Sequence, residues 1–171
     1  TLKALKQKGI DYRGVIYAGL MLTDSGPKVI EFNCRFGDPE CQALMPLMGM
    51  EFARVLQACA LGCLEEAPKL NIFNHCSACI VAAAYGYPEA TRSGDFVKVE
   101  VETNESLQLF HAGTSCNEDG ELITSGGRVI SIVAQGKNFD DAFNIAYAGI
   151  NKVHFEGMTF RHDIGNQVRK S

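Results

Sequence analysis

The sequence lacks several features that would place it at once in a particular class of protein. No apolar run reaches the roughly 18 residues that a membrane-spanning helix needs, and the first residues show no signal-peptide pattern. There is no internal repeat and no low-complexity tract, and the net charge of -4 shows no excess of basic residues. We therefore expect no membrane association and no nucleic-acid partner.

The cysteines do not suggest a disulfide framework. There are 7 of them, an odd number, scattered through apolar segments, which indicates free thiols in a reducing compartment. We therefore expect a cytoplasmic protein. Four of them have a spacing that superficially resembles a zinc ribbon: Cys59, Cys63, Cys76 and Cys79. A non-catalytic zinc-binding module is thus one reading, and buried small hydrophobic side chains are the other.

The composition is sufficient for a real hydrophobic core. Among 171 residues, 46% are hydrophobic and 21% are charged, which is typical of a soluble globular protein of one domain or two small ones. Residues 68–75 mix Pro, Asn and Lys between two ordered regions of different character. We therefore predict an α+β protein with two domains, residues 1–67 and residues 68–171.

The first predicted domain contains a hairpin and helices. Residues 12–23 and 29–36 are apolar and rich in strand formers, and the turn DSGPK lies between them. We expect a hairpin of two largely buried strands. Pro39 suits the start of a helix, and residues 51–67 have apolar side chains at helical spacing, which predicts an amphipathic helix packed on the sheet.

The second predicted domain is richer in strands. Several segments between residues 75 and 136 read as strands joined by short turns, with NEDG at 117–120 as a hairpin tip. One helix is predicted over 138–153, with Asn138 as its N-cap. We expect this helix to lie across a sheet.

Polar residues alternate with apolar ones at the end of the second hairpin strand. Glu31, Asn33 and Arg35 fall on one face, and Asp38 and Glu40 follow in a turn that leads into a helix. A carboxylate and an amide oxygen are hard ligands that suit Mg²⁺, and an arginine can hold a phosphate in a bidentate fork. The two acids after the strand could hold a substrate amine. A structural ion pair of Glu31 with Arg35, or with a lysine elsewhere, would explain the same residues and stays open.

These residues carry a resemblance to a known family. EFNCRFGDPECQ at 31–42, with the preceding YRGVIYAGLMLTDSGPKVI, closely resembles the end of the ATP-grasp domain of the phosphoribosylamine–glycine ligases, also called glycinamide ribonucleotide synthetases. The likeness continues, in order and spacing, through GYP (86–88), FHAGT (110–114), SGGRV (125–129) and FRHDIG (160–165). The tail motif and the ECQ after GDP look closer to the eukaryotic form, in which the ligase is fused to two later activities.

The resemblance implies an ATP-dependent ligase of purine biosynthesis that joins glycine to 5-phosphoribosylamine through glycyl phosphate. It implies that Glu31 and Asn33 bind Mg²⁺ or Mn²⁺, and that Arg35 is catalytic, beside the transferred phosphoryl group. It also implies that Asp38 and Glu40 line the substrate pocket. The preceding strand reads AGLML, without the second metal-binding carboxylate of many other ATP-grasp enzymes.

The resemblance also implies that a complete ligase has parts this sequence does not show. The chain opens on a helical pattern, and the Gly-rich phosphate loop of the family is absent. We therefore expect a fragment that is inactive alone, with a sheet edge that would invite self-association. Another ATP-grasp purine ligase is an alternative. His111, and a possible anion-binding nest at Ser125, Gly126 and Gly127, are left without an assigned role.

Overall fold

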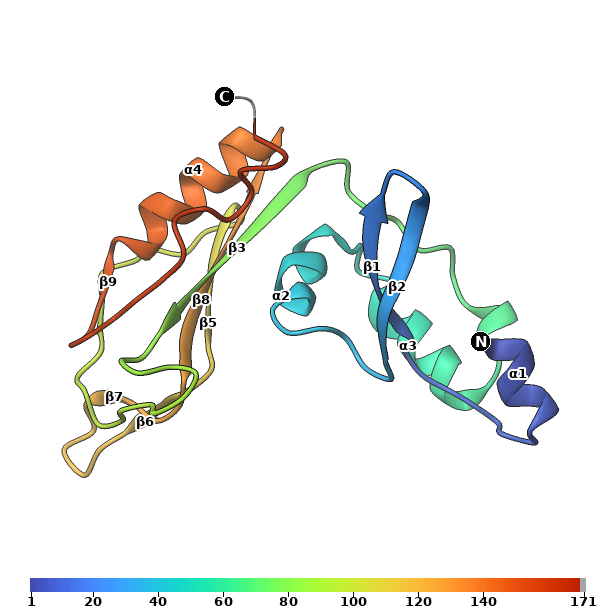
Figure 1. The fold of residues 1–171 in the computed structure, drawn as a ribbon, viewed down its shortest axis with the longest axis horizontal. Coiled ribbons are helices and arrows are strands. Elements are labelled where there is room, and N and C mark those ends of the chain that lie inside the picture. Colours follow the sequence, from blue (N-terminus) through green and yellow to red (C-terminus); the bar gives the residue numbers. More distant parts are fainter. Residues whose placement is uncertain (170–171) are drawn as a thin grey trace. The chain divides into compact units, whose positions relative to one another are not determined.

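The computed structural model describes residues 1–169, which form two compact units (Figure 1). The N-terminal unit contains residues 1–38 and 48–73, and the C-terminal unit contains residues 39–47 and everything from 74 onward. Residues 39–47 thus pack with the C-terminal unit, although their neighbours on both sides in the sequence belong to the N-terminal unit. The domain limits 1–67 and 68–171 remain a prediction.

The N-terminal unit consists of a hairpin and two helices, together with a short 3-10 turn. Its elements are α1 (Leu2–Gln7), β1 (Tyr17–Thr23), β2 (Gly26–Asn33), α3 (Phe52–Leu61) and η2 (Leu64–Glu66). The predicted amphipathic helix is therefore present as α3, but it ends before residue 67. It stops because Gly62 adopts a left-handed conformation with φ of 78°, which ends a helix at little steric cost.

The predicted hairpin is confirmed. Strands β1 and β2 pair antiparallel, from Tyr17 opposite Asn33 to Thr23 opposite Gly26. The turn is closed by the Thr23 hydroxyl, which donates a hydrogen bond of 2.7 Å to the Gly26 carbonyl. The register shifts between Gly19 and the next residue, so the strands are locally bulged beside the predicted site.

The expectation that the hairpin is largely buried was wrong. Ile30 and Phe32 on β2 are 63% and 54% exposed, and Leu22 on β1 is 82% exposed. Cys34, just beyond the end of β2, is exposed as well. The apolar pattern predicted two strands here, but β1 and β2 form a sheet of their own with 2 strands, and within residues 1–169 these side chains stay more than half exposed.

The C-terminal unit is built on an antiparallel sheet in the order β3-β8-β5. Two further strand pairs, β4–β9 and β6–β7, lie outside it. Its elements are α2 (Glu40–Leu44), η1 (Met45–Leu47), β3 (Cys76–Ala83), β4 (Lys98–Val99), β5 (Leu107–His111), β6 (Thr114–Cys116), β7 (Leu122–Thr124), β8 (Arg128–Gly136), α4 (Phe139–Ile150) and β9 (Val153–His154). The NEDG segment forms the predicted tip between β6 and β7.

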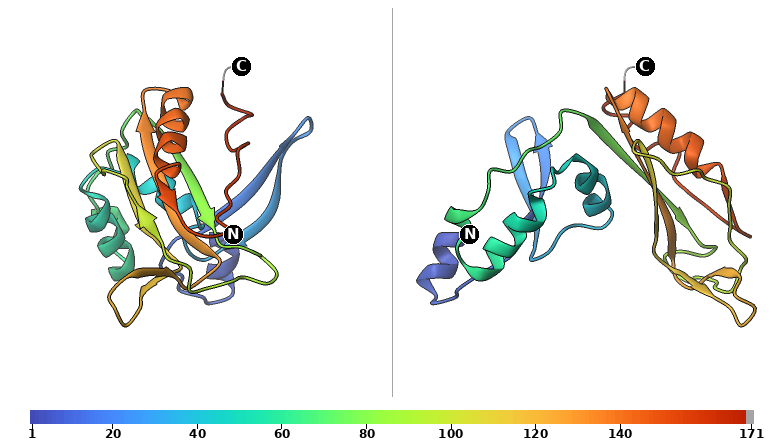
Figure 2. Two further views of the ribbon diagram at one scale, coloured as in Figure 1. Left: turned by 90° about the vertical axis from the view of Figure 1, so that its left-hand side faces the viewer. Right: turned by 180° about the vertical axis from the view of Figure 1, so that it is seen from behind.

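The core of the described chain lies between this sheet and α4, as predicted. Figure 2 shows α4 along one face of the sheet, where it packs on β3 and β8. Ile80, Ile132 and Ile150 are at most 1% exposed. The helix begins at the predicted N-cap, because the side chain of Asn138 accepts a hydrogen bond of 2.9 Å from the Asp141 amide.

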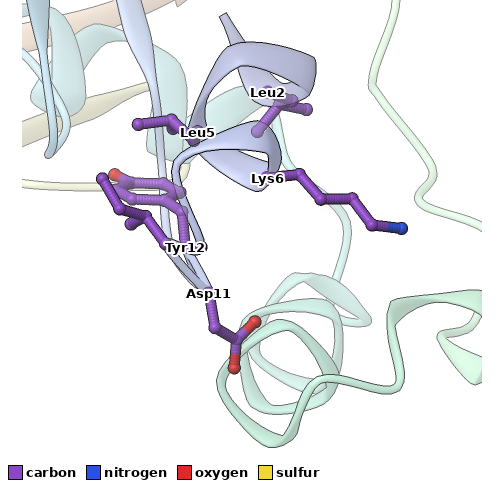
Figure 3. Close-up of a pocket in the computed structure, with 7 residues that line it drawn as sticks. Leu2, Leu5, Lys6, Asp11 and Tyr12 are labelled. Atoms are coloured by element: carbon purple, nitrogen blue, oxygen red, sulfur yellow. The ribbon is translucent and has the colours of Figure 1, made fainter.

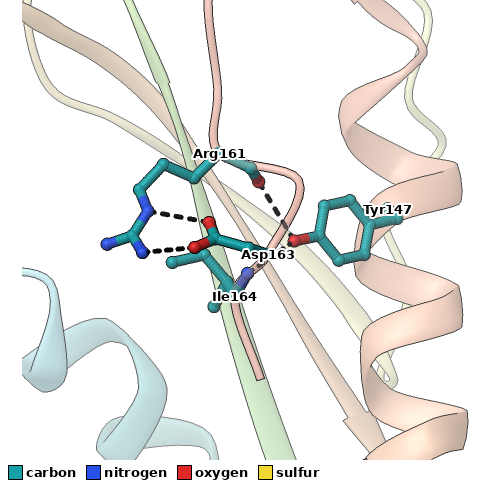
Figure 4. Close-up of polar contacts among 4 residues, drawn as sticks. All are labelled: Tyr147, Arg161, Asp163 and Ile164. Carbon is teal, nitrogen blue, oxygen red and sulfur yellow. Dashed lines mark hydrogen bonds and ion pairs between the residues drawn. The ribbon is translucent and has the colours of Figure 1, made fainter. Parts of the chain in front are cut away.

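The segment after β9 is tied back onto α4 (Figure 4). The Tyr147 hydroxyl donates to the Arg161 carbonyl at 3.0 Å and accepts from the Ile164 amide at 3.1 Å. Arg161 and Asp163 form an ion pair, with 2.6 Å between Nη2 and Oδ2. One tyrosine therefore holds both sides of the turn that this ion pair spans.

Candidate functional site

The structure brings Glu31 and Asn33 together at the end of β2. The Asn33 side-chain amide donates a hydrogen bond of 2.9 Å to Glu31 Oε1, so the two side chains lie on the same face of the hairpin. Glu31 is exposed and Asn33 is half-buried. The contact leaves the second carboxylate oxygen and the amide oxygen as further acceptors, which is a small group of hard oxygen ligands open to solvent.

Gly19, which the sequence argument did not single out, lies directly across from Glu31. The two residues pair in the register of β1 and β2, and a Cβ placed on Gly19 would lie 3.1 Å from the Glu31 Cγ. The aliphatic part of the Glu31 side chain therefore packs against the backbone of Gly19, where there is no side chain. The sequence does show a glycine in the AGLML segment, which has no acid. Only the pairing register of the two strands shows that this glycine faces Glu31.

Arg35 lies beyond the end of the strand. Strand β2 ends at Asn33, and Arg35 follows in a bend, where its Nη1 donates 2.9 Å to the carbonyl of Phe36. The strand alternation that predicted one continuous polar face therefore does not extend to Arg35. The bend is anchored because the ring of Phe36 packs edge-on against Phe52 of α3, with 6.0 Å between their centres.

The two acids after the bend belong to different units. Asp38 is the last residue of the first N-terminal segment, whereas Glu40 is the first residue of α2 in the C-terminal unit. Both are exposed. The turn at Gly37 and Pro39 thus carries the chain out of one unit and into the other within a few residues.

Two of the alternative readings find no support in the described part of the chain. The ion pair between Glu31 and Arg35 is not formed, because within residues 1–169 neither residue takes part in any ion pair. The zinc alternative fails as well: in the same range no group of three or more His, Cys, Asp or Glu side chains could hold a metal. The cysteines of its proposed set form no disulfide and are half-buried: Cys59, Cys63, Cys76 and Cys79.

A concave pocket is present elsewhere in the N-terminal unit (Figure 3). Its volume is about 460 Å³, and it is lined by Leu2, Leu5, Lys6, Gly9, Ile10, Asp11 and Tyr12. Figure 3 shows Lys6 extending away from the Tyr12 ring. None of the predicted site residues lines this pocket, so it adds no group to the site on β2.

Two carboxyl groups of the C-terminal unit have lowered pKa values. The hydrogen bond from Arg161 lowers the pKa of Asp163 below its ordinary value, and the hydrogen bond from Lys98 lowers that of Glu100 in the same way. These are exposed ion pairs. They keep these carboxyl groups ionised at the surface of the unit, and a carboxyl group with a lowered pKa is not suited to act as a general acid or base near neutral pH.

The nest suggested for the SGGR segment is not formed. A nest needs a residue in the left-handed region, and neither Gly126 nor Gly127 has a positive φ. Both lie in the turn between β7 and β8. His111 ends β5, and its Nδ1 lies 3.1 Å from the Thr114 hydroxyl.

Comparisons with known proteins agree with this arrangement. Residues 1–41 match the family described as phosphoribosylglycinamide synthetase, ATP-grasp (A) domain, which assigns the hairpin and its polar end to an ATP-grasp protein. Residues 77–167 match the family described as phosphoribosylglycinamide synthetase, C domain. The chain belongs to the phosphoribosylglycinamide synthetase family.

Individual relatives show the same affiliation. The chain is 44% identical over 170 residues to the phosphoribosylamine–glycine ligase of Synechocystis, covering 98% of this chain and 40% of that protein. The human trifunctional purine biosynthetic protein adenosine-3 is 40% identical over 171 residues, with 96% of this chain and 16% of that protein covered. The motifs that look eukaryotic are thus not accompanied by a higher overall identity to the eukaryotic form.

A solved structure confirms the fold. The crystal structure of phosphoribosylamine–glycine ligase from Thermotoga maritima superposes with a TM-score of 0.81 at 34% identity, covering 95% of this chain and 39% of that one. The chain thus spans about 40% of the length of the single-function relatives that it matches. None of the helices in residues 1–169 is long and apolar enough to cross a membrane.

Proposed function

We propose that this chain supplies the C-terminal part of a phosphoribosylamine–glycine ligase. The reaction begins when a glycine carboxylate oxygen attacks the γ-phosphorus of ATP, forming glycyl phosphate and releasing ADP. The amine of 5-phosphoribosylamine then attacks the glycyl carbon, loses a proton and expels phosphate, which yields glycinamide ribonucleotide. The observation that carries the proposal is the Glu31–Asn33 contact at the polar end of a hairpin that matches the ATP-grasp family.

Each residue of the site has a role in this proposal. Arg35 offsets the negative charge that grows on the transferred phosphoryl group, for which its planar guanidinium is suited. Asp38 and Glu40 line the substrate pocket, as the family resemblance implies, because a carboxylate can accept hydrogen bonds from a substrate amine. Tight anchoring of this bend by Phe36 keeps Arg35 close to the end of β2.

The residues on β2 fit a divalent cation. Glu31 and Asn33 together offer one carboxylate and one amide oxygen on an exposed face, a donor set that suits Mg²⁺ or Mn²⁺ completed by water and phosphate oxygens. When bound, the ion would neutralise phosphate charge. Glu31 and Asn33 hold one another in place at 2.9 Å, so this half of the site is ordered by the chain itself.

The chain matches only about 40% of the length of its single-function relatives. We propose that the chain alone does not turn over ATP, and that it acts with the N-terminal part found in the family, in the cytoplasm. The exposed apolar faces of β1 and β2 support this, because side chains such as Phe32 and Leu22 are of the kind that a protein normally covers. Without that part, association of these faces between copies is the expected outcome.

The experiment is a split-ligase assay. The N-terminal part of a phosphoribosylamine–glycine ligase is mixed with this chain, or joined to it, and ADP release is measured with glycine and 5-phosphoribosylamine present and with each left out. We expect ADP release over many turnovers only when both substrates and both protein parts are present. Release by this chain alone, or release that needs neither substrate, would contradict the proposal.

A further inference from the structure

The sheet of the C-terminal unit is covered on both faces. Figure 1 shows α4 on one side of the sheet β3-β8-β5 and α2 on the other. Helix α2 packs against β3 and β8, and the 3-10 turn η1 that follows it packs against β3. The segment that continues the chain from β2 is therefore seated on the sheet of the C-terminal unit, to which residues 39–47 belong.

Side chains of the sheet alternate between these two faces. Ile80 of β3 and Ile132 of β8 are paired and belong to the core cluster that also contains Ile150 of α4. Val133 follows Ile132 and is only 1% exposed, although it lies outside that cluster. Because neighbouring residues of a strand point to opposite faces, Val133 lies on the face on which α2 packs. This face, here called the α2 seat, is formed by Ser77, Cys79 and Val81 of β3 and by Ser131, Val133 and Gln135 of β8.

Helix α2 is too short to hold its own position. It has 5 residues, Glu40–Leu44, and its N-cap is Pro39, whose side chain cannot accept a hydrogen bond from the first turn. Isolated helices shorter than about 12–15 residues are marginal in water, and most helical stability in proteins comes from tertiary packing. The position of α2 therefore depends on the α2 seat.

Glu40 takes its position from this helix. It is the first residue of α2, so its backbone is placed wherever the helix is placed, whatever its carboxylate contacts. On the other side of the bend, Phe36 is held by its packing against Phe52 of the N-terminal unit. The short stretch that carries Asp38 and Glu40 is thus anchored by a ring contact before it and by a helix seated on the sheet after it.

We propose that Val133 is a positioning residue for Glu40 in the ligase. The buried valine side chain supports α2, and α2 sets where the backbone of Glu40 lies. This inference rests on the proposed function, in which Glu40 lines the substrate pocket. It gives the C-terminal sheet a part in binding the amine-bearing substrates without any contact between Val133 and a substrate.

The test compares two identical substitutions on β8 in the split ligase. Val133→Ala removes support beneath α2, whereas Val129→Ala, the matched control, removes the same atoms from the core cluster. Both valines are at most 1% exposed, so both variants lose stability. We expect Val133→Ala to raise the KM for glycine, for 5-phosphoribosylamine or for both several-fold, and to leave the KM for ATP unchanged. Val129→Ala should leave all three KM values unchanged.

Two further variants keep the test decisive if Val133→Ala does not fold or acts by general destabilisation. Ala43→Gly lowers the helix propensity within α2 without changing the sheet, and it should raise the same KM. Combined with Glu40→Gln, either change should raise that KM by less than it does alone, because a positioning effect is not additive with loss of the group that is positioned. Equal increases with and without Glu40→Gln would overturn the inference.

The inference and the proposed function can fail separately. Hydrogen exchange of the α2 amides is measured on this chain without substrates, so it reports the α2 seat even if the split ligase shows no turnover. Val133→Ala should speed exchange in α2 several-fold, and Val129→Ala should not. Unchanged exchange in Val133→Ala would refute the seat. A loosened α2 in an active ligase with unaltered KM values would refute the positioning role while the ligase proposal stands.

Discussion

Gly19 and Glu31 face each other across the hairpin, and a Cβ on Gly19 would lie only 3.1 Å from the Glu31 Cγ. This separation is shorter than ordinary contacts between carbon atoms, so any side chain at position 19 must displace the glutamate by a few tenths of an ångström. The same glutamate accepts the hydrogen bond from Asn33. The geometry of the proposed metal ligands therefore depends on a residue that carries no functional group.

We predict that Gly19→Ala weakens divalent-cation binding. The added methyl group should displace the Glu31 side chain by a few tenths of an ångström and so disturb its 2.9 Å contact with Asn33. Titration of this chain with Mn²⁺, followed by electron paramagnetic resonance, should show a several-fold loss of affinity. Met21→Ala, an exposed change on the same strand, is the matched control and should have no effect. Wild-type affinity in Gly19→Ala would mean that Glu31 is not a ligand in this position.

We also predict that Arg35→Ala abolishes turnover in the split ligase. Removing a charge that stabilises the transferred phosphoryl group typically costs about 10²–10³-fold or more in rate. Because Arg35 is exposed and, within residues 1–169, hydrogen-bonds only to the neighbouring carbonyl of Phe36, the fold should be unaffected. Arg54→Ala, an exposed arginine on α3, should retain full activity. Near wild-type turnover by Arg35→Ala would remove the catalytic role.

The hairpin shows how far sequence reasoning reaches. Its two strands and the turn between them followed from local preferences, which act within a few residues, although β2 runs from Gly26 to Asn33 and not over 29–36. Its burial did not, because apolar residues such as Ile30 and Phe32 only signal that something should cover them. Whether a strand is buried depends on which other segments pack against it, and the strand's own sequence does not contain that information.

The site divides in a similar way. Strand periodicity correctly placed Glu31 and Asn33 side by side, but it was extended past the true end of β2 to reach Arg35. Gly19 could not be recognised, because pairing register is set by the bulge and the turn together. In contrast, Asn138 was recognisable as the start of α4, because an N-cap depends only on the residues that follow it.

Tyr147→Phe should loosen the C-terminal segment. The change removes the hydrogen bond to the Arg161 carbonyl and leaves the part-buried Ile164 amide without its acceptor. We expect a loss of roughly 1–3 kcal/mol in the free energy of unfolding, measured by urea denaturation. Tyr85→Phe is the control, because Tyr85 is 60% exposed. Equal stabilities of the two variants would show that the tyrosine does not hold the segment.

The Arg161–Asp163 pair should make a small, pH-dependent contribution to stability. Because the pKa of Asp163 is lowered in the folded state, the stabilisation is complete above the ordinary carboxyl pKa of about 3.9 and is lost as the pH falls through the lower folded value. Asp163→Asn should therefore lower the melting temperature slightly at pH 7, and the difference should vanish in acid. A difference that grows in acid would contradict the assignment.

Two isoleucine truncations should separate the true core from the exposed hairpin. Ile132 is fully buried in β8, and replacing it by Ala should cost about 2–5 kcal/mol in the free energy of unfolding. Ile30 is 63% exposed on β2, and the same replacement should change stability by no more than about 0.5 kcal/mol. Urea denaturation at low protein concentration measures both. A large cost for Ile30→Ala under these conditions would mean that the hairpin face is covered in solution, and sedimentation would then show a second copy of the chain.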